Sequence, residues 1–218
     1  MSSAHFSSNI IETELKYALT KTEYNILKKQ LDSFPHKTQL QTNYYFDSLS
    51  LRLQTKKIGL RIRTSGSNPP VLTLKFPKPS KKSLITSLKI RYEYEANLSI
   101  RETKDILAGK KRISTLSSLP LEILKTKIQP ALMNRLINLG SLQTQRTLYR
   151  YSHGQALELD QSKFFNQKFY ELEVETTTPR KTDRLIKKIF TENGIKYRAE
   201  KISKLERFLK EWKKQKKT

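Results

Sequence analysis

The chain has 218 residues, no cysteine and a formal net charge of +23. Its length suits a single domain with its own core, and the absence of cysteine excludes disulfide scaffolds, thiolate metal sites and cysteine nucleophiles. The positive charge favours a polyanionic partner, such as nucleic acid, an anionic membrane surface or polyphosphate. The sequence contains neither a transmembrane run of about 18 apolar residues nor a secretory signal pattern, so we expect a cytoplasmic protein.

Alternation of apolar and charged side chains predicts several strands in the first hundred residues. The first runs over residues 10–19. Thr20 and Glu23 then form a capping-box pattern that starts a helix, and Pro35 ends it. The further strands expected in this half cover residues 39–46, 58–63, 71–76 and 87–98.

Between residues 100 and 140 the spacing of apolar residues indicates two or three helices instead. Pro120 and Pro130 each suit the first turn of a short helix, and Gly140 suits the position after a helix end. Strand patterns return at residues 143–151, 156–160 and 169–176, with a turn at His153-Gly154. An amphipathic helix over 179–193 and a basic segment over 196–218 complete the chain.

Charged side chains occupy one face of nearly every predicted strand. Glu171, Glu173 and Glu175 share one face, because side chains at i and i+2 lie about 6–7 Å apart along a strand. The wet face of an antiparallel sheet shows the same alternation. However, neighbouring like charges disfavour a sheet unless something neutralises them. We therefore expect an α+β fold, an antiparallel barrel or sandwich in which the charged faces point inward and helices cover the apolar faces.

Such an interior would contain clustered acids and clustered bases. Carboxylates suit hard divalent cations such as Mg²⁺ or Mn²⁺, whereas Arg and Lys suit phosphate oxygens. A cavity that offers both suits a metal–polyphosphate complex. The acids on these faces are Glu12, Glu14, Glu93, Glu95, Glu158, Asp160, Glu171, Glu173 and Glu175; the bases are Lys16, Arg61, Arg63, Lys75, Lys89, Arg91, Arg146 and Arg150.

The order of these motifs resembles the CYTH superfamily, the triphosphate tunnel metalloenzymes. The similarity begins with Glu12-x-Glu14-x-Lys16, a weak signal alone. It continues in order through residues 43–47, 60–63, 72–75, 91–95, 157–160 and 170–175, and it ends at Ser203-Lys204. The closest pattern is that of small single-domain tripolyphosphatases, and it covers residues 10–208, with a basic tail over 209–218.

The resemblance implies an eight-stranded antiparallel β-barrel, a tunnel that binds triphosphate together with Mg²⁺ or Mn²⁺. It implies metal ligands at Glu12, Glu14, Glu93, Glu95, Asp160, Glu171, Glu173 and Glu175. It implies triphosphate-binding residues at Lys16, Arg61, Arg63, Lys75, Arg91, Arg146 and Lys204. Catalytic roles are implied for Lys16, Asp160 and Lys204.

Hydrolysis of inorganic triphosphate is the leading function expected from this resemblance. Two alternatives within the superfamily are hydrolysis of thiamine triphosphate, which is a triphosphate ester, and adenylyl cyclase activity. The chain lacks the His-Phe element of the cyclases, which disfavours the second. A module that binds polyphosphate or RNA without catalysis is a further alternative, but such a module gains nothing from nine inward acids. The basic tail could attract polyanions non-specifically.

Overall fold

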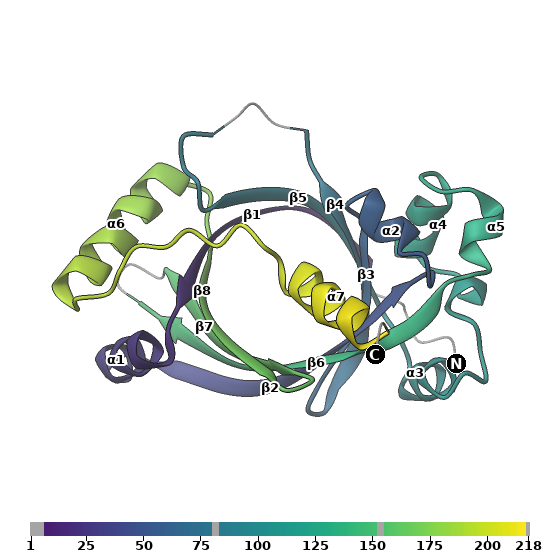
Figure 1. Cartoon of the computed structure of the whole chain (residues 1–218), viewed down its shortest axis with the longest axis horizontal. Coiled ribbons are helices and arrows are strands. Elements are labelled where there is room, and N and C mark those ends of the chain that lie inside the picture. The colour runs from purple at the N-terminus through teal and green to yellow at the C-terminus, as the bar shows by residue number, and fades with distance from the viewer. Residues whose placement is uncertain (1–6, 80–82, 152–154, 217–218) are drawn as a thin grey trace.

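Eight antiparallel strands close into a barrel in this computed structural model, which describes residues 7–79, 83–151 and 155–216 (Figure 1). The order around the barrel is β1-β5-β4-β3-β2-β6-β7-β8. The strands are β1 (Ser7–Leu19), β2 (His36–Asp47), β3 (Gly59–Ser65), β4 (Asn68–Pro77), β5 (Leu88–Asn97), β6 (Ile137–Arg150), β7 (Ala156–Phe164) and β8 (Gln167–Glu175). The predicted barrel is therefore confirmed, while the expected turn at His153-Gly154 lies outside the described residues.

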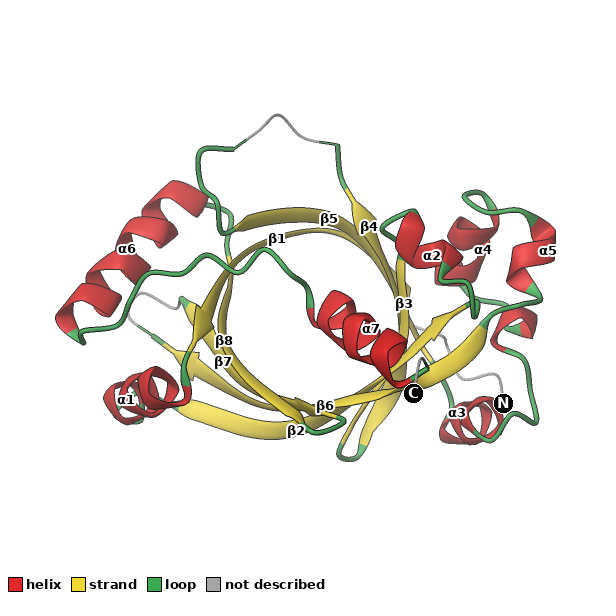
Figure 2. Cartoon of the chain, viewed as in Figure 1, coloured by secondary structure: helices red, strands yellow, loops and turns green. Residues whose placement is uncertain are grey.

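Helices flank the barrel on its outer side, and α7 crosses one of its ends (Figure 2). They are α1 (Lys21–Leu31), α2 (Arg52–Thr55), α3 (Ile100–Leu107), α4 (Leu119–Lys125), α5 (Pro130–Met133), α6 (Pro179–Glu192) and α7 (Lys204–Gln215), with a 3₁₀ turn at Ile113–Thr115. The capping box of Thr20 and Glu23 begins α1 as predicted. In the described ranges, no helix is both long and apolar enough to cross a membrane.

Two of the three hydrophobic clusters lie outside the barrel wall. On β1, Leu15 and Tyr17 point outward into a cluster formed with α1 and α6. A second cluster joins the outer faces of β3 and β4 to the helices that follow β5. Because side chains alternate along a strand, burying these outward faces turns the charged positions inward.

Helix α7 lies across one end of the barrel and packs against its inner rim. Phe208 is fully buried there with Tyr45 and Leu142. Two glycines make room for the helix, since a Cβ at Gly59 would lie 3.1 Å from Leu205 Cδ2 and one at Gly140 would lie 3.1 Å from Phe208 Cζ. The barrel is therefore narrowed by α7 at this end.

Gly140 does not end a helix, contrary to the prediction. It lies within β6, which begins at Ile137, and it adopts a φ of +132° opposite a register shift between Tyr45 and Phe46 of β2. The glycine is needed for this backbone conformation and for the close approach of α7. Sequence spacing alone did not distinguish this strand irregularity from a helix stop.

Helix α2 was not predicted from the sequence. The buried carboxylate of Asp47 organises its loop by accepting hydrogen bonds from the backbone N–H groups of Ser48, Leu53 and Gln54, at 2.7, 2.8 and 2.9 Å. This short helix is therefore stabilised by one Asp side chain, and its sequence lacks the apolar periodicity from which longer helices are predicted.

Candidate active site

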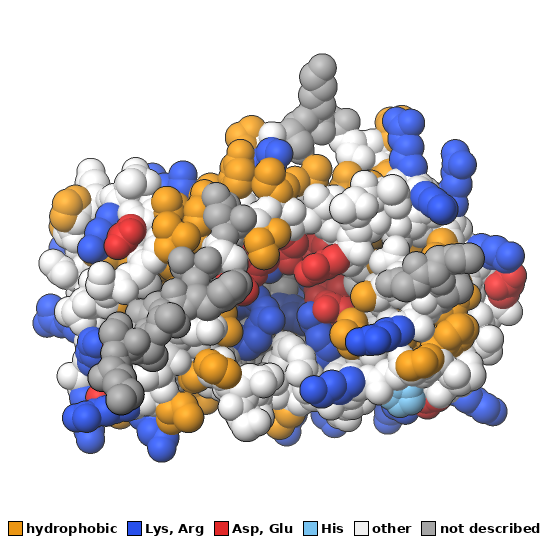
Figure 3. Space-filling model, turned by 180° about the vertical axis from the view of Figure 1, so that it is seen from behind, with side chains coloured by type: hydrophobic (Ala, Val, Ile, Leu, Met, Phe, Trp, Pro, Cys, Tyr) orange, Lys and Arg blue, Asp and Glu red, His pale blue; other side chains and the backbone are white. Residues whose placement is uncertain are grey.

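A cavity of about 930 Å³ runs inside the barrel. Seen from behind, its mouth is a hollow where acidic and basic side chains gather (Figure 3). The charged residues that line it are Glu12, Glu14, Lys16, Lys57, Arg61, Arg63, Lys75, Lys89, Arg91, Glu93, Glu95, Arg146, Glu158, Glu173, Glu175, Lys201, Lys204 and Glu206. Of the predicted site residues, only Asp160 and Glu171 do not line the cavity, and both are fully buried in its wall.

The register of β1 with its neighbours brings the predicted motifs together. Glu14 pairs with Lys89 of β5 on one side and with Glu175 of β8 on the other. One position further along the same face, Lys16 pairs with Glu173. The first motif in the sequence is therefore placed beside the last strand, where the barrel closes.

Lys204, at the start of α7, inserts its ammonium among three carboxylates. Its Nζ lies 2.8 Å from Asp160 Oδ2, 2.9 Å from Glu171 Oε2 and 2.7 Å from Glu173 Oε1. A Ser203–Glu206 capping box fixes the first turn of α7 and so holds the base of this side chain. We call Asp160, Glu171, Glu173 and Lys204 the Lys204 cluster.

Two further cations surround this cluster. Lys16 Nζ lies 2.5 Å from Glu173 Oε1, and Arg146 Nη2 lies 2.6 Å from Asp160 Oδ2 and 2.5 Å from Glu173 Oε2. Burial alone would raise the pKa of the Glu173 carboxyl, but Lys16, Lys204 and Arg146 lower it well below its usual range. Burial opposes the charge of Lys204, yet Asp160, Glu171 and Glu173 raise its pKa well above the usual value. Both Glu173 and Lys204 are therefore held in their charged forms.

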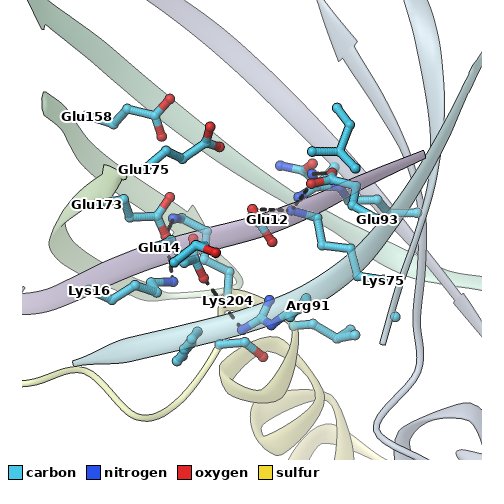
Figure 4. A pocket seen from close by; sticks show the side chains of 18 of the residues that line it. Glu12, Glu14, Lys16, Lys75, Arg91, Glu93, Glu158, Glu173, Glu175 and Lys204 are labelled. Carbon is cyan, nitrogen blue, oxygen red and sulfur yellow. Dashed lines mark hydrogen bonds and ion pairs between the residues drawn. The ribbon is translucent and has the colours of Figure 1, made fainter. Parts of the chain in front are cut away.

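The remaining acids of the cavity are paired less completely (Figure 4). Lys75 Nζ lies 2.6 Å from Glu12 Oε1 and 3.0 Å from Glu93 Oε2, whereas the Arg91 guanidinium is 3.6 Å from Glu14 Oε1. We call Glu12, Glu14, Glu93, Glu95 and Glu175 the open acidic group. Burial raises the pKa of the Glu175 carboxyl, and repulsion from Glu12, Glu93 and Glu14 adds to the effect.

Buried charged atoms without a hydrogen-bond partner concentrate in this part of the described chain. They include Glu12 Oε2 among the carboxylate oxygens, and Arg61 Nε and Nη2, Arg63 Nε and Lys89 Nζ among the donors. Burying such atoms unpaired is costly, which indicates partners that the protein itself does not supply. The oxygens fit a hard divalent cation and the donors fit phosphate oxygens.

Several residues that line the cavity were not predicted as site residues. Lys89 and Glu158 were on the charged faces, and their i, i+2 spacing from Arg91 and Asp160 was the available signal. Burial, with Lys16 and Arg91 nearby, lowers the pKa of Lys89 to about 8, and burial raises that of Glu158 to about 7. Arg150, counted on the same faces, is exposed at the end of β6 and is not a lining residue.

Lys57, Lys201 and Glu206 had no sequence signal at all. Lys57 enters the cavity wall from the loop after α2, with a φ of +58°, and the other two come from the start of α7 and the segment before it. Lys57 and Lys201 lie in loops, whose residues follow no strand or helix period, whereas Glu206 lies in the first turn of α7. Only the folded chain brings them to the site.

Known proteins resemble this chain in sequence and in structure. The sequence model of the CYTH domain matches residues 10–209. YjbK of Bacillus subtilis strain 168, described as a candidate triphosphatase, is 29% identical over 206 residues, which cover 94% of this chain and 97% of that protein.

The similar solved structures include two that each match 92% of this chain. One is HpAC1 from Hippeastrum, described as a candidate adenylyl cyclase with a dominant triphosphatase activity; it has a TM-score of 0.80, 28% identity and 96% of its own chain covered. The other is a candidate adenylate cyclase from Bacillus halodurans, with a TM-score of 0.74, 25% identity and 98% of its chain covered.

Proposed function

The chain belongs to the CYTH domain family, and from this membership we propose that it hydrolyses triphosphate substrates with a divalent metal, inorganic triphosphate first among them. The triphosphatase activity described for HpAC1 and the description of YjbK support a hydrolase. The choice of substrate and the need for metal rest on the site itself.

The proposal rests on one observation: the same cavity contains buried acidic and basic atoms that have no hydrogen-bond partner. Glu12 offers a buried oxygen without a partner, while Arg61, Arg63 and Lys89 offer buried donors without acceptors. A polyanion alone would be repelled by the open acidic group, and a metal alone would leave the donors unpaired. A metal–triphosphate complex satisfies both sets at once.

We assign the residues of the cavity to two roles. Glu12 and Glu14 of β1 and Glu175 of β8 would hold the divalent cation. Arg61, Arg63, Lys75, Lys89 and Arg91, from β3, β4 and β5, would bind phosphate oxygens. The bound metal would neutralise phosphate charge and make water a stronger nucleophile. The catalytic roles predicted for Lys16, Asp160 and Lys204 remain predictions.

Adenylyl cyclase activity is the second candidate, because two similar structures carry that description. A cyclase must also hold an adenine ring. Among the described residues that line the cavity, Tyr45 is the one aromatic, and its ring already packs 5.2 Å from that of Phe208. A substrate without a base suits this lining better, which favours inorganic triphosphate.

Phosphate release from a substrate panel tests the proposal. Purified protein is assayed with inorganic triphosphate, ATP, thiamine triphosphate and 5′-triphosphorylated RNA, each with Mg²⁺, Mn²⁺ or excess chelator, and cyclic AMP is measured in the ATP reactions. We expect the highest rate on inorganic triphosphate and none with chelator. Cyclic AMP as the main product would favour the cyclase, and absence of turnover on every substrate would contradict an enzyme.

Two further assignments also remain predictions. The domain was expected to end at residue 208, and residues 209–215 continue α7, with Leu209 buried. Attraction of polyanions by the basic tail, residues 209–218, and a cytoplasmic location have no support beyond the sequence.

A further inference from the structure

The most compact acidic cluster of the cavity wall is also the most buried one. In the described part of the chain, Asp160, Glu171 and Glu173 are the one set of three acidic side chains whose ligand atoms lie within 4.8 Å of one another. Asp160 and Glu171 are 0% exposed and Glu173 is 6% exposed. By spacing and donor chemistry this triad could hold a metal ion.

The centre of the triad is already filled by Lys204. Its Nζ lies within 2.7–2.9 Å of one oxygen from each of the three carboxylates. Neither oxygen of Glu171 has a hydrogen-bond partner, although both are buried. Glu171 is therefore held by nearby positive charges rather than by directed hydrogen bonds. Lys204 is the nearest of these charges, while Lys16 Nζ lies 3.6 Å from Oε2 and Arg207 Nε lies 3.9 Å from Oε1.

We propose that the Lys204 ammonium is a built-in cation that keeps the Asp160–Glu171–Glu173 triad free of metal, and that removing it creates an additional divalent-metal site. This inference rests on the proposed function and sharpens it, because it leaves the open acidic group to bind the catalytic metal. Lys204 is in this reading a positioning residue that sets how many ions the cavity takes.

The surrounding charges strengthen the exclusion. Lys16 and Arg146 also contact Glu173, and Arg146 contacts Asp160. A divalent ion in the triad would add two positive charges beside three existing ones at low dielectric. An ammonium attached to a helix that packs against the barrel also needs no recruitment from solution, so it occupies the site at any metal concentration.

The test counts bound Mn²⁺ on metal-free protein, by the loss of the free-ion electron paramagnetic resonance signal, without triphosphate. We expect Lys204→Met to bind one more Mn²⁺ per chain than the native protein. The double variant Lys204→Met, Glu171→Gln should return to the native count, because it removes a triad ligand. A Lys204→Met protein that binds no additional ion would overturn the proposal.

Lys201→Met is the matched control. Lys201 also lines the cavity, three residues before Lys204, but it is exposed and outside the triad. It should leave the Mn²⁺ count unchanged. An equal gain in both variants would mean that lowering the overall positive charge is enough to recruit an ion, and the specific role of Lys204 would be refuted.

Native-background variants keep the proposal testable if Lys204→Met does not fold. Glu171→Gln alone should leave Mn²⁺ affinity as it is, whereas Glu12→Gln should weaken it at least about tenfold. A comparable loss in Glu171→Gln would show that the triad binds metal in the native protein and would overturn the inference. Because no substrate is present, these outcomes stand apart from the hydrolysis assay. An inactive protein with the predicted Mn²⁺ counts would contradict the proposed function alone.

Discussion

Lys75 on β4 reaches past β5 to Glu12 on β1, with its Nζ 2.6 Å from Glu12 Oε1, and leaves Oε2 of the same carboxylate buried and unpartnered. One oxygen is thus fixed and the other is available. Glu12→Gln replaces the charged ligand by an amide of nearly equal size. We expect kcat to fall about 10- to 100-fold, in line with about 1.5–3 kcal/mol for a charge-assisted contact, and the metal concentration for half-maximal rate to rise.

Metal titrations of triphosphate hydrolysis measure this effect. Glu122→Gln, on the exposed face of α4, removes the same charge far from the cavity wall and should behave as the native protein. If Glu12→Gln needs the same metal concentration for half-maximal rate as the native protein, this carboxylate stabilises the barrel and does not bind the metal ion.

Arg63 on β3 offers a buried Nε without a partner. Arg63→Ala should raise KM for triphosphate about 10- to 100-fold, because a charge-assisted contact to phosphate is lost. A parallel fall in kcat is expected if the same contact strengthens as charge develops during transfer. Arg101→Ala on the outer helix α3 is the control. Steady-state kinetics in which both variants match the native KM would place Arg63 outside the substrate site.

Lys89 gives the site a pH dependence. Burial, together with the positive charges of Lys16 and Arg91, lowers the pKa of Lys89 to about 8. Only the protonated ammonium attracts phosphate, so kcat/KM of the free enzyme should decline as pH rises through about 8. Lys89→Met should be weaker at neutral pH and should lose this decline. If the native and variant profiles stay parallel from pH 6.5 to 9.5, the decline arises from another group.

Gly140 is predicted to be intolerant of any side chain. Alanine there must adopt a φ of +132° and place its Cβ 3.1 Å from Phe208 Cζ. We expect Gly140→Ala to lower the free energy of unfolding by about 2 kcal/mol or more. Gly66→Ala is the milder comparison, because Gly66 has a φ of +51°, in the left-handed region that alanine can adopt at modest cost, and no atom lies within 4 Å of the added Cβ. Thermal melting should show the larger loss for Gly140→Ala, and equal losses would contradict the predicted cost of strain and contact at Gly140.

Asp183 ties α6 to β1 and to the segment before α7. Its carboxylate accepts hydrogen bonds from Tyr17 at 3.0 Å and Tyr197 at 2.8 Å, and Lys187 Nζ lies 2.8 Å away. Burial alone would raise the pKa of Asp183, but Lys187, Tyr197 and Tyr17 lower it from its usual 3.8. Its stabilising effect is therefore complete above pH 4 and is lost as pH falls through the lowered pKa.

Asp183→Asn should therefore destabilise the protein by about 1.5–3 kcal/mol at neutral pH, and the difference from the native protein should shrink in acid. Denaturant unfolding at pH 7 and pH 3 measures both quantities. A difference that grows toward pH 3 would contradict the assigned sign.

The alternation of apolar and charged residues, such as Leu15 and Lys16, predicted an antiparallel barrel or sandwich with an inward charged face. The resemblance in motif order then implied the eight-stranded barrel. Most site positions follow from that alternation together with the motif order. The same alternation could not show that Asp160 and Glu171 are sealed in the wall behind Lys204, because burial depth depends on where α7 lies.

Loop contributions were beyond prediction for a related reason. Lys57 reaches the cavity only because Asp47 folds the preceding loop through three backbone hydrogen bonds. Gly140 was assigned to a helix end because a glycine in the sequence is compatible both with the end of a helix and with an irregularity in a strand. In both cases the conformation depends on a tertiary contact that the spacing of apolar residues along the sequence does not predict.

Glu173 contacts one cation from the first strand and one from the last helix, Lys16 of β1 and Lys204 of α7, and the barrel itself closes between β1 and β8. Hairpins such as β3–β4 and β7–β8 need only short loops, but joining the first strand to the last requires closing nearly the whole chain. Such non-local topology slows folding to about the millisecond-to-second range. The ability to capture a divalent ion should therefore appear late and all at once during refolding, well after the first hairpins have formed.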